Sequence, residues 1–174
     1  DFRPPSAGPY VFNEGELENF RRRGKDLREV KAEKAEQTGK FYGLMMDHLR
    51  KVLSDIKRVY PGYNVEKGYE LAGFVWFQGW NDMVASGTYP NRGQPGGYDA
   101  YTDCLAHFIR DVRKDLEAPK MKFVIGVMGV GGPLEQYASQ RYVPIHGAFR
   151  EAMAAPSLMP EFKGNVFAVR TAKF

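Results

Sequence analysis

The sequence predicts an α/β fold in which helices cover a parallel β-sheet. Three short, continuous apolar segments rich in β-branched and aromatic residues alternate with longer amphipathic segments. Repeated alternation of strands and helices predicts parallel strands, right-handed crossovers and helices on both faces of the sheet. A chain of 174 residues can bury the core of one domain, so we expect a single domain over residues 1–174.

The first third of the chain is expected to be mainly helical. Residues 1–9 are rich in Pro and Gly and should be irregular. The charged stretch 15–40 is interpreted as a polar, solvent-facing helix or as a partly mobile insertion. Apolar residues then recur three and four positions apart from Phe41 to Val59. This spacing predicts an amphipathic helix, which Pro61 and Gly62 should end.

The first strand is expected at residues 71–77. Its continuous apolar composition is typical of a strand that is buried on both faces. Open α/β sheets bind their ligands beyond the carboxyl ends of the strands, so the turn that follows is the main candidate for chemistry. That turn reads Gln78, Gly79, Trp80, Asn81 and Asp82.

The second half of the chain repeats the pattern of helix and strand. We expect a helix at 99–116, a strand at 122–128, a helix at 143–154 and a strand at 165–170. Loop 87–98, which follows the first strand and its turn, is rich in Gly and Pro and long enough to be functional. Its candidates for shaping a pocket for a polar substrate are Tyr89, Asn91, Arg92, Gln94 and Tyr98.

Three strands make a small sheet with unpaired edges. Such edges expose backbone hydrogen-bonding groups and apolar surface. We therefore expect further chain, covalent or associated, to complete the sheet.

Composition excludes several classes of protein. Hydrophobic residues make up 43% of the chain and charged residues 26%, so it is neither disordered nor membrane-spanning. The net charge of +4 gathers in the first sixty residues, where a solvated helix face explains it, and no nucleic acid partner is expected. Cys104 and His107 lack a second pair of ligands, so we expect no metal. No cofactor is expected either.

Asn81 is the strongest candidate for a catalytic role. A side-chain amide at the end of a strand can donate a hydrogen bond to the oxygen that becomes negative during acyl transfer. Gly79 would let the backbone approach a substrate, and Gln78 and Asp82 could orient the amide. Trp80 could form a wall of the pocket, stack on a sugar or belong to the core.

These residues also resemble a known family. Gly79-Trp80-Asn81-Asp82 is similar to the Gly-x-Asn-Asp third block of the SGNH (GDSL-like) hydrolases. The lead-in 74–79 resembles the Trp-x-Gln-Gly segment of the sialate O-acetylesterase-like carbohydrate esterases in that superfamily, although Trp80-Asn81 departs from their usual Gly-Glu continuation. Segments 1–6, 123–133 and 149–156 also look like parts of bacterial members.

The resemblance implies a flavodoxin-like three-layer α/β/α sandwich and a serine esterase that removes acetyl groups from sugars. Asn81, together with a second-block glycine, would form the oxyanion hole. The substrate would be an acetylated carbohydrate, and the enzyme would be secreted or periplasmic.

The sequence contains neither of the family's outer blocks. No serine stands in a Gly-Gln-Ser, Gly-Asp-Ser or Gly-x-Ser-x-Gly setting, and no Asp stands three residues before His48, His107 or His146. We therefore expect the first strand, the nucleophile, the base and the C-terminal end of the domain to lie outside this chain. The chain alone should be inactive, and the rest of the domain would be a partner.

Two other functions stay open at this point. The first is a non-catalytic carbohydrate-binding module on the same fold, with Trp80, Tyr89 and Tyr98 as stacking surfaces. The second is a nucleotide-binding α/β protein. It is less favoured, because the glycines at 126–132 have neither P-loop nor dinucleotide-fold spacing.

Overall fold

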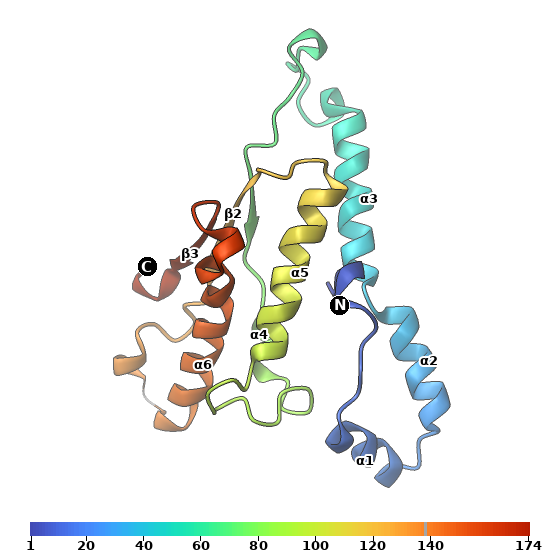
Figure 1. Cartoon of the computed structure of the whole chain (residues 1–174), viewed down its shortest axis with the longest axis vertical. Helices are drawn as coiled ribbons and strands as arrows, with labels where there is room; N and C mark the ends of the chain where they lie inside the picture. Colours follow the sequence, from blue (N-terminus) through green and yellow to red (C-terminus); the bar gives the residue numbers. More distant parts are fainter. Residues whose placement is uncertain (138) are drawn as a thin grey trace.

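The structure is a computed structural model that describes residues 1–137 and 139–174 (Figure 1). Within these residues the strands are β1 (Gly73–Trp76), β2 (Lys122–Val127) and β3 (Val166–Arg170). The α-helices are α1 (Glu14–Arg22), α2 (Leu27–Gln37), α3 (Lys40–Ser54), α4 (Trp80–Val84), α5 (Asp99–Asp115) and α6 (Val143–Ala154). No helix in this part of the chain has both the length and the apolarity that a membrane span requires.

The three strands form one parallel sheet in the order β1-β2-β3. Gly73 pairs with Lys122 between β1 and β2, and Phe123 pairs with Val166 between β2 and β3. Helix α5 links β1 to β2, and α6 links β2 to β3. The predicted α/β fold with a parallel sheet is therefore confirmed, and the carboxyl ends of all three strands meet at one edge.

The core lies between one face of the sheet and helices α5 and α6 (Figure 1). Phe108 of α5 packs against two side chains of β1, with ring centroids 4.4 Å from Trp76 and 5.9 Å from Phe74. Phe123 of β2 and Phe149 of α6 are completely buried. The apolar stripe expected in the helix at 99–116 therefore does face the sheet, whereas Phe41 and Leu44 of the stripe expected from 41 to 59 are at least half exposed.

The opposite face of the sheet carries exposed apolar side chains. Val75 of β1 is 72% exposed and Phe77 is 65% exposed, while Phe167 and Val169 of β3 are nearly half exposed. The register places Val75, Val124 and Phe167 in one row across the three strands, so these residues form a continuous apolar face. The expectation that the first strand is buried on both faces is wrong, because α5 and α6 pack only on the other face. The sheet and its helices form two layers of an α/β/α sandwich.

Helices α1 and α2 form a charged arm at the lower right of Figure 1. Neither helix buries a residue, which confirms the expected polar, solvent-facing character of this stretch. Local signals explain both helices. Asn13 and Glu16 form a capping box at the start of α1, and the Asp26 side chain accepts a hydrogen bond from the Arg28 N–H at the start of α2.

Helix α3 ends earlier than predicted. It stops at Ser54 because Asp55 leaves the helical conformation, with φ −145° and ψ 70°. Inside the helix, Tyr42 and Met46 are buried. The Tyr42 ring lies 5.6 Å from Phe108, so α3 packs beside α5.

Candidate functional site

The polar turn after β1 leads directly into the short helix α4. Gly79 caps this helix with φ 157° and lies against the core. A Cβ atom on Gly79 would lie 2.7 Å from Cζ of Phe149 and 3.3 Å from the Tyr101 hydroxyl. Because Phe149 is fully buried, any larger residue at position 79 would have to displace core side chains. Glycine is therefore needed here for packing α4 against α6.

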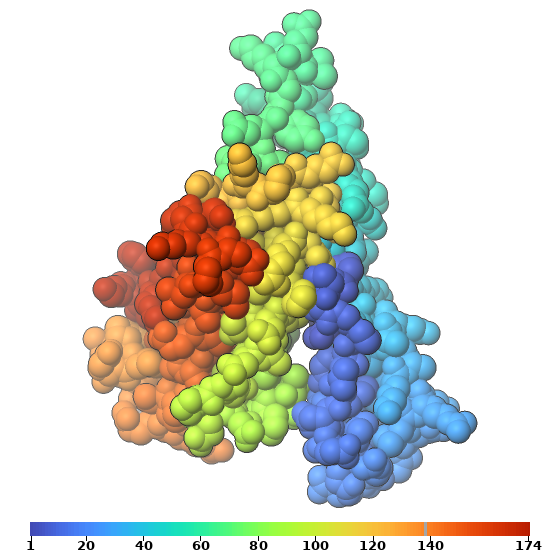
Figure 2. Space-filling model, viewed as in Figure 1, coloured from blue at the N-terminus to red at the C-terminus, as the bar shows by residue number. Residues whose placement is uncertain are grey.

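A cavity of about 510 Å³ lies between this turn, α5 and the N-terminal segment. Figure 2 shows an opening in the surface between the N-terminal residues, in blue, and the segment around α4 and the start of α5, in green. Aromatic and charged side chains line the cavity together, which is an arrangement suited to a polar ligand with apolar faces. The lining includes Arg3, Tyr10, Lys34, Gln78, Asn81, Asp82, Tyr89 and Tyr101.

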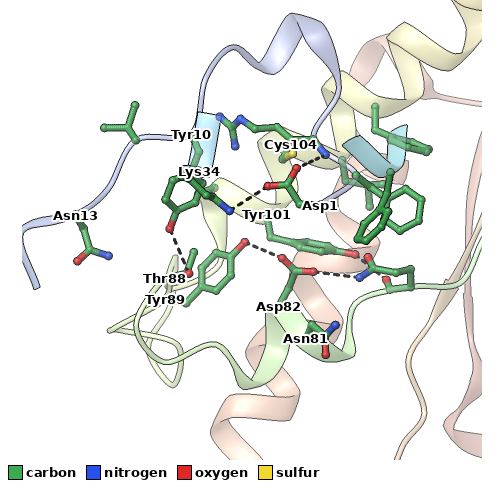
Figure 3. Close-up of a pocket in the computed structure, with 18 of the residues that line it drawn as sticks. Asp1, Tyr10, Asn13, Lys34, Asn81, Asp82, Thr88, Tyr89, Tyr101 and Cys104 are labelled. Atoms are coloured by element: carbon green, nitrogen blue, oxygen red, sulfur yellow. Dashed lines mark hydrogen bonds and ion pairs between the residues drawn. The ribbon is translucent and has the colours of Figure 1, made fainter. Parts of the chain in front are cut away.

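Three of the predicted site residues meet at this cavity: Gln78, Asn81 and Asp82. Asn81 is exposed, and Figure 3 marks no interaction between its amide and the other residues drawn. The three lie together because they follow one another closely at the carboxyl end of β1. Within α4, Asn81 and Asp82 point in different directions from the helix axis.

Tyr89 of loop 87–98 also lines the cavity, whereas the structure places the other predicted residues elsewhere. Gly79 packs against α6 as described above, and Trp80 is 49% exposed. Arg92 donates a hydrogen bond from Nη1 to the Val84 carbonyl at 2.7 Å, and this bond connects loop 87–98 to the end of α4. In the described parts of the chain, the cavity lining includes none of these three residues.

Asp82 is a carboxylic acid of the cavity whose pKa is shifted by its surroundings. Its Oδ2 accepts a hydrogen bond from Gln78 Nε2 at 3.3 Å, and its Oδ1 accepts one from the Tyr89 hydroxyl at 3.4 Å (Figure 3). Burial raises the pKa of Asp82, and these two hydrogen bonds and the nearby Lys34 only partly oppose that shift. The side chains of Gln78 and Asp82 thus bond to each other, whereas the sequence predicted that they orient the Asn81 amide.

Sequence reasoning missed the residues that the N-terminal segment and α2 bring to the cavity. Lys34 Nζ lies 3.2 Å from Asp1 Oδ2 and 4.2 Å from the centre of the Tyr10 ring. Burial is the main cause that lowers the pKa of Lys34. Arg3 donates from Nε and Nη2 to two carbonyl oxygens of the turn that follows it, both at 2.8 Å. Lys34 stands within a long run of charges, so no local signal distinguishes it.

Glu16 fastens the charged arm to the rim of the cavity. Its Oε1 accepts hydrogen bonds from the Tyr10 hydroxyl at 2.6 Å and from Thr88 Oγ1 at 3.2 Å. Its Oε2 accepts one from the Asn13 N–H at 3.0 Å, and Asn13 Nδ2 donates to the Gly87 carbonyl at 2.8 Å. The arm and the loop after α4 therefore meet through a polar network.

The comparison with protein families identifies the chain. A family model described as "Carbohydrate esterase, sialic acid-specific acetylesterase" matches residues 24–157, which include β1, the turn 78–82 and α5. The chain belongs to this carbohydrate esterase family. The resemblance to sialate O-acetylesterase-like enzymes is thus confirmed, and the fold is consistent with part of their α/β/α sandwich. No curated protein and no solved structure matches the chain.

The tyrosines of loop 87–98 differ in their surroundings. Tyr98, predicted as a stacking surface, is 1% exposed and donates a hydrogen bond to the Met83 carbonyl at 2.6 Å. It is a core residue, so that prediction is wrong. Tyr89 is also largely buried, but it lines the cavity.

The candidates that the sequence analysis set aside lie in two places. Cys104 lines the cavity, and burial raises the pKa of its thiol. His107 lies outside the lining, and its Nδ1 shares a hydrogen bond of 2.8 Å with Ser6 Oγ. Among the described residues, no three His, Cys, Asp or Glu side chains are grouped as a metal site.

Proposed function

We propose that this chain carries the oxyanion-binding part of a carbohydrate O-acetylesterase. Membership of the carbohydrate esterase family supports hydrolysis of acetyl esters on sugars. The observation that carries the proposal is the position of Asn81, whose exposed side chain lines a cavity at the carboxyl end of β1. Ligand crevices of α/β sheets lie at this edge.

In the proposed reaction a serine hydroxyl attacks the carbonyl carbon of the acetyl group, and a histidine takes the proton of that hydroxyl. The carbonyl oxygen becomes negative, and the Asn81 amide donates a hydrogen bond to it. The histidine then protonates the departing sugar oxygen, and water releases acetate from the serine. We propose that the serine and the Asp/His base come from residues outside this sequence.

Asn81 contributes because its position is set before the reaction begins. The donor is part of α4, which is held against α6 by the contact between Gly79 and Phe149. A donor carried on a fixed backbone needs less reorientation to stabilise the developing charge than a donor on a mobile segment. Trp80, half exposed beside the cavity, is proposed to contact the carbohydrate outside it.

The test measures acetate release from O-acetylated sugars. The polypeptide encoded by the complete reading frame should release acetate, whereas the 174-residue chain alone should not. In the active form, Asn81→Ala should lower kcat by roughly 10²–10³-fold with little change in KM, because the lost donor acts on the transition state.

Asn91→Ala removes an amide of the same kind from the exposed part of the loop and serves as the matched control. It should leave kcat unchanged. Equal losses in both variants would contradict the role of Asn81. Turnover by the 174-residue chain alone would contradict the proposal of an external nucleophile.

A second candidate function is a non-catalytic carbohydrate-binding module. The tyrosine rings of Tyr10 and Tyr89 in the cavity lining favour it, because aromatic rings stack on sugar faces. This function would be preferred if the complete polypeptide bound acetylated sugars but released no acetate.

A further inference from the structure

We propose that residues 9–38, which include the charged arm, form a lid that opens and closes the cavity by turning about Gly8 and Gly39. A lid of this kind admits a ligand when it is open and excludes water when it is closed. Opening and closing concern access to the cavity and do not depend on the chemistry proposed for Asn81. One wall of the cavity belongs to β1, α4 and α5, and the lid supplies side chains of the opposite wall. These are Tyr10, Val11, Asn13, Glu16 and Lys34.

Both junctions of the lid are glycines in backbone conformations that other residues rarely adopt. Gly8 has φ 67° and ψ −171°, and Gly39 has φ 73° and ψ 0°. Arg3 lies between the two junctions. Its Nε donates a hydrogen bond to the Gly8 carbonyl at 2.8 Å, and a Cβ atom on Gly39 would lie 2.9 Å from its carbonyl oxygen. The two ends of the lid therefore leave the rest of the molecule close together, as in a hinge.

The chain on the far side of each junction is fixed to the core. Phe2 packs edge-on against Trp76 of β1, with ring centroids 5.3 Å apart. The Ser6 N–H donates a hydrogen bond of 2.8 Å to the buried Asp111 of α5. Helix α3, which begins directly after the second junction, packs beside α5. Movement of the lid is therefore concentrated at the two glycines.

The lid is held together by its own contacts. Phe12 packs edge-on against Tyr10 and Phe20, with ring centroids 5.1 and 5.6 Å apart. The capping box of Asn13 and Glu16 fixes the start of α1. Neither α1 nor α2 contains a buried residue, so the lid adds little apolar area to the core. It can therefore move as one piece and expose little apolar surface.

Two hydrogen bonds hold the lid against loop 87–98, and we call them the latch. Asn13 Nδ2 donates to the Gly87 carbonyl at 2.8 Å, and Thr88 Oγ1 donates to Glu16 Oε1 at 3.2 Å. Water can replace polar contacts of this kind, so each contributes only a modest net free energy. The latch is therefore suited to break and re-form.

The loop side of the latch is fixed to the core. Tyr89, which follows Thr88, is 8% exposed, and its ring centroid lies 5.0 Å from that of the buried Tyr98. In Figure 1, α1 lies at the end of the lid away from the junctions, which are near the N-terminus. Opening therefore breaks the latch, and the lid is the part that moves.

Cys104 can report whether the lid opens, because it is the single cysteine of the chain and lines the cavity. Its rate of alkylation is measured on the 174-residue chain with two reagents, the small iodoacetamide and the bulky fluorescein maleimide. Thr88→Val keeps the shape of the side chain and removes its hydrogen bond to Glu16. The rate with the maleimide should rise about fivefold, the factor expected for one lost hydrogen bond. The rate with iodoacetamide should rise less, because the small reagent needs less opening.

Glu16→Gln weakens the latch from the side of the lid and keeps a residue that can complete a capping box. It should also raise the ratio of the maleimide rate to the iodoacetamide rate. Thr171→Val is the matched control, because Thr171 Oγ1 donates a hydrogen bond of 2.8 Å to the Val127 carbonyl, away from the lid. It should leave the ratio unchanged.

Unfolding would raise both rates alike, so the ratio separates opening of the lid from a loss of folding. The proposal is overturned if neither latch variant raises the ratio, or if Thr171→Val raises it as much as they do. Acetate release is not measured in this experiment, so either result leaves the proposed esterase function to its own test.

Discussion

Asn81 and Asp82 are neighbours in the sequence but occupy different environments. Asn81 is exposed at the cavity rim, whereas Asp82 is mostly buried between Gln78 and Tyr89. Successive residues of a helix point about 100° apart, so α4 separates the two side chains. The proposed role of oxyanion donor therefore falls to the exposed Asn81 and not to its buried neighbour.

The raised pKa of Asp82 predicts a pH-dependent stability. Because burial raises this pKa in the folded protein above its value of about 3.9 in an unfolded chain, the folded state binds the proton more tightly. The free energy of unfolding therefore falls as pH rises from the unfolded pKa through the folded one. The Asp82→Asn variant has no ionisable group at this position, so its free energy of unfolding does not fall for this reason. The free energy of unfolding of the variant minus that of the unaltered chain should therefore be larger at pH 7 than at pH 3.

Urea denaturation at the two pH values measures this difference. Asp103→Asn, an exposed acid of α5, should show a much smaller change with pH. If Asp82→Asn and the unaltered chain differ in stability by the same amount at pH 3 and pH 7, the pKa of Asp82 is not raised on folding.

At the scale of elements, β1 and β2 show how one strand can face two environments. Trp76 of β1 packs on α5, and its neighbour Val75 points to the opposite, exposed face. Val127 of β2 lies on the covered face and is 1% exposed. Consecutive side chains of a strand point to opposite faces of the sheet. Replacement of valine by alanine should therefore lower the free energy of unfolding more on the covered face than on the exposed face.

Val127→Ala should lower the free energy of unfolding by about 2 kcal/mol, because it removes buried methyl groups and leaves a cavity. Val75→Ala should cost about 1 kcal/mol or less, which reflects only the lower strand preference of alanine. Chemical denaturation of both variants measures the two costs. Similar costs would show that the face of β1 that carries Val75 is covered in solution.

At the scale of the whole molecule, one face of the sheet is an exposed apolar surface. It combines Val75 and Phe77 with Phe167 and Val169 on neighbouring parts of one sheet. Contiguous apolar patches are rare on monomeric proteins and mark sites of contact with other chain or other molecules. The sequence-based expectation that further chain completes the sheet stays a prediction.

The apolar face should bind the dye ANS, which reports exposed hydrophobic surface. A double variant, Val75→Thr with Phe167→Thr, should lower the fluorescence of the bound dye and leave the unfolding midpoint nearly unchanged. Threonine keeps the strand preference of these positions. Leu158→Thr changes a single residue that is 82% exposed and lies outside the strands, and it should leave the signal unchanged. Unchanged fluorescence in the double variant would show that the dye does not bind to this face of the sheet.

The sequence by itself determined the elements and the family. Apolar runs located the strands, helical spacing located α5, and the block Gly79–Asp82 indicated the family and the likeness of Asn81 to an oxyanion donor. These features are local, since a strand, an amphipathic helix or a short motif is written in consecutive residues.

Only the tertiary structure decided which faces are covered and what surrounds the motif. Periodicity says that Val75 and Trp76 point to opposite sides, but not which side a helix covers. Likewise, nothing near Lys34 indicates that α2 carries it to the cavity of Asp82. Burial and charge at a site depend on segments far apart in the chain, and their positions follow from packing, which no local pattern records.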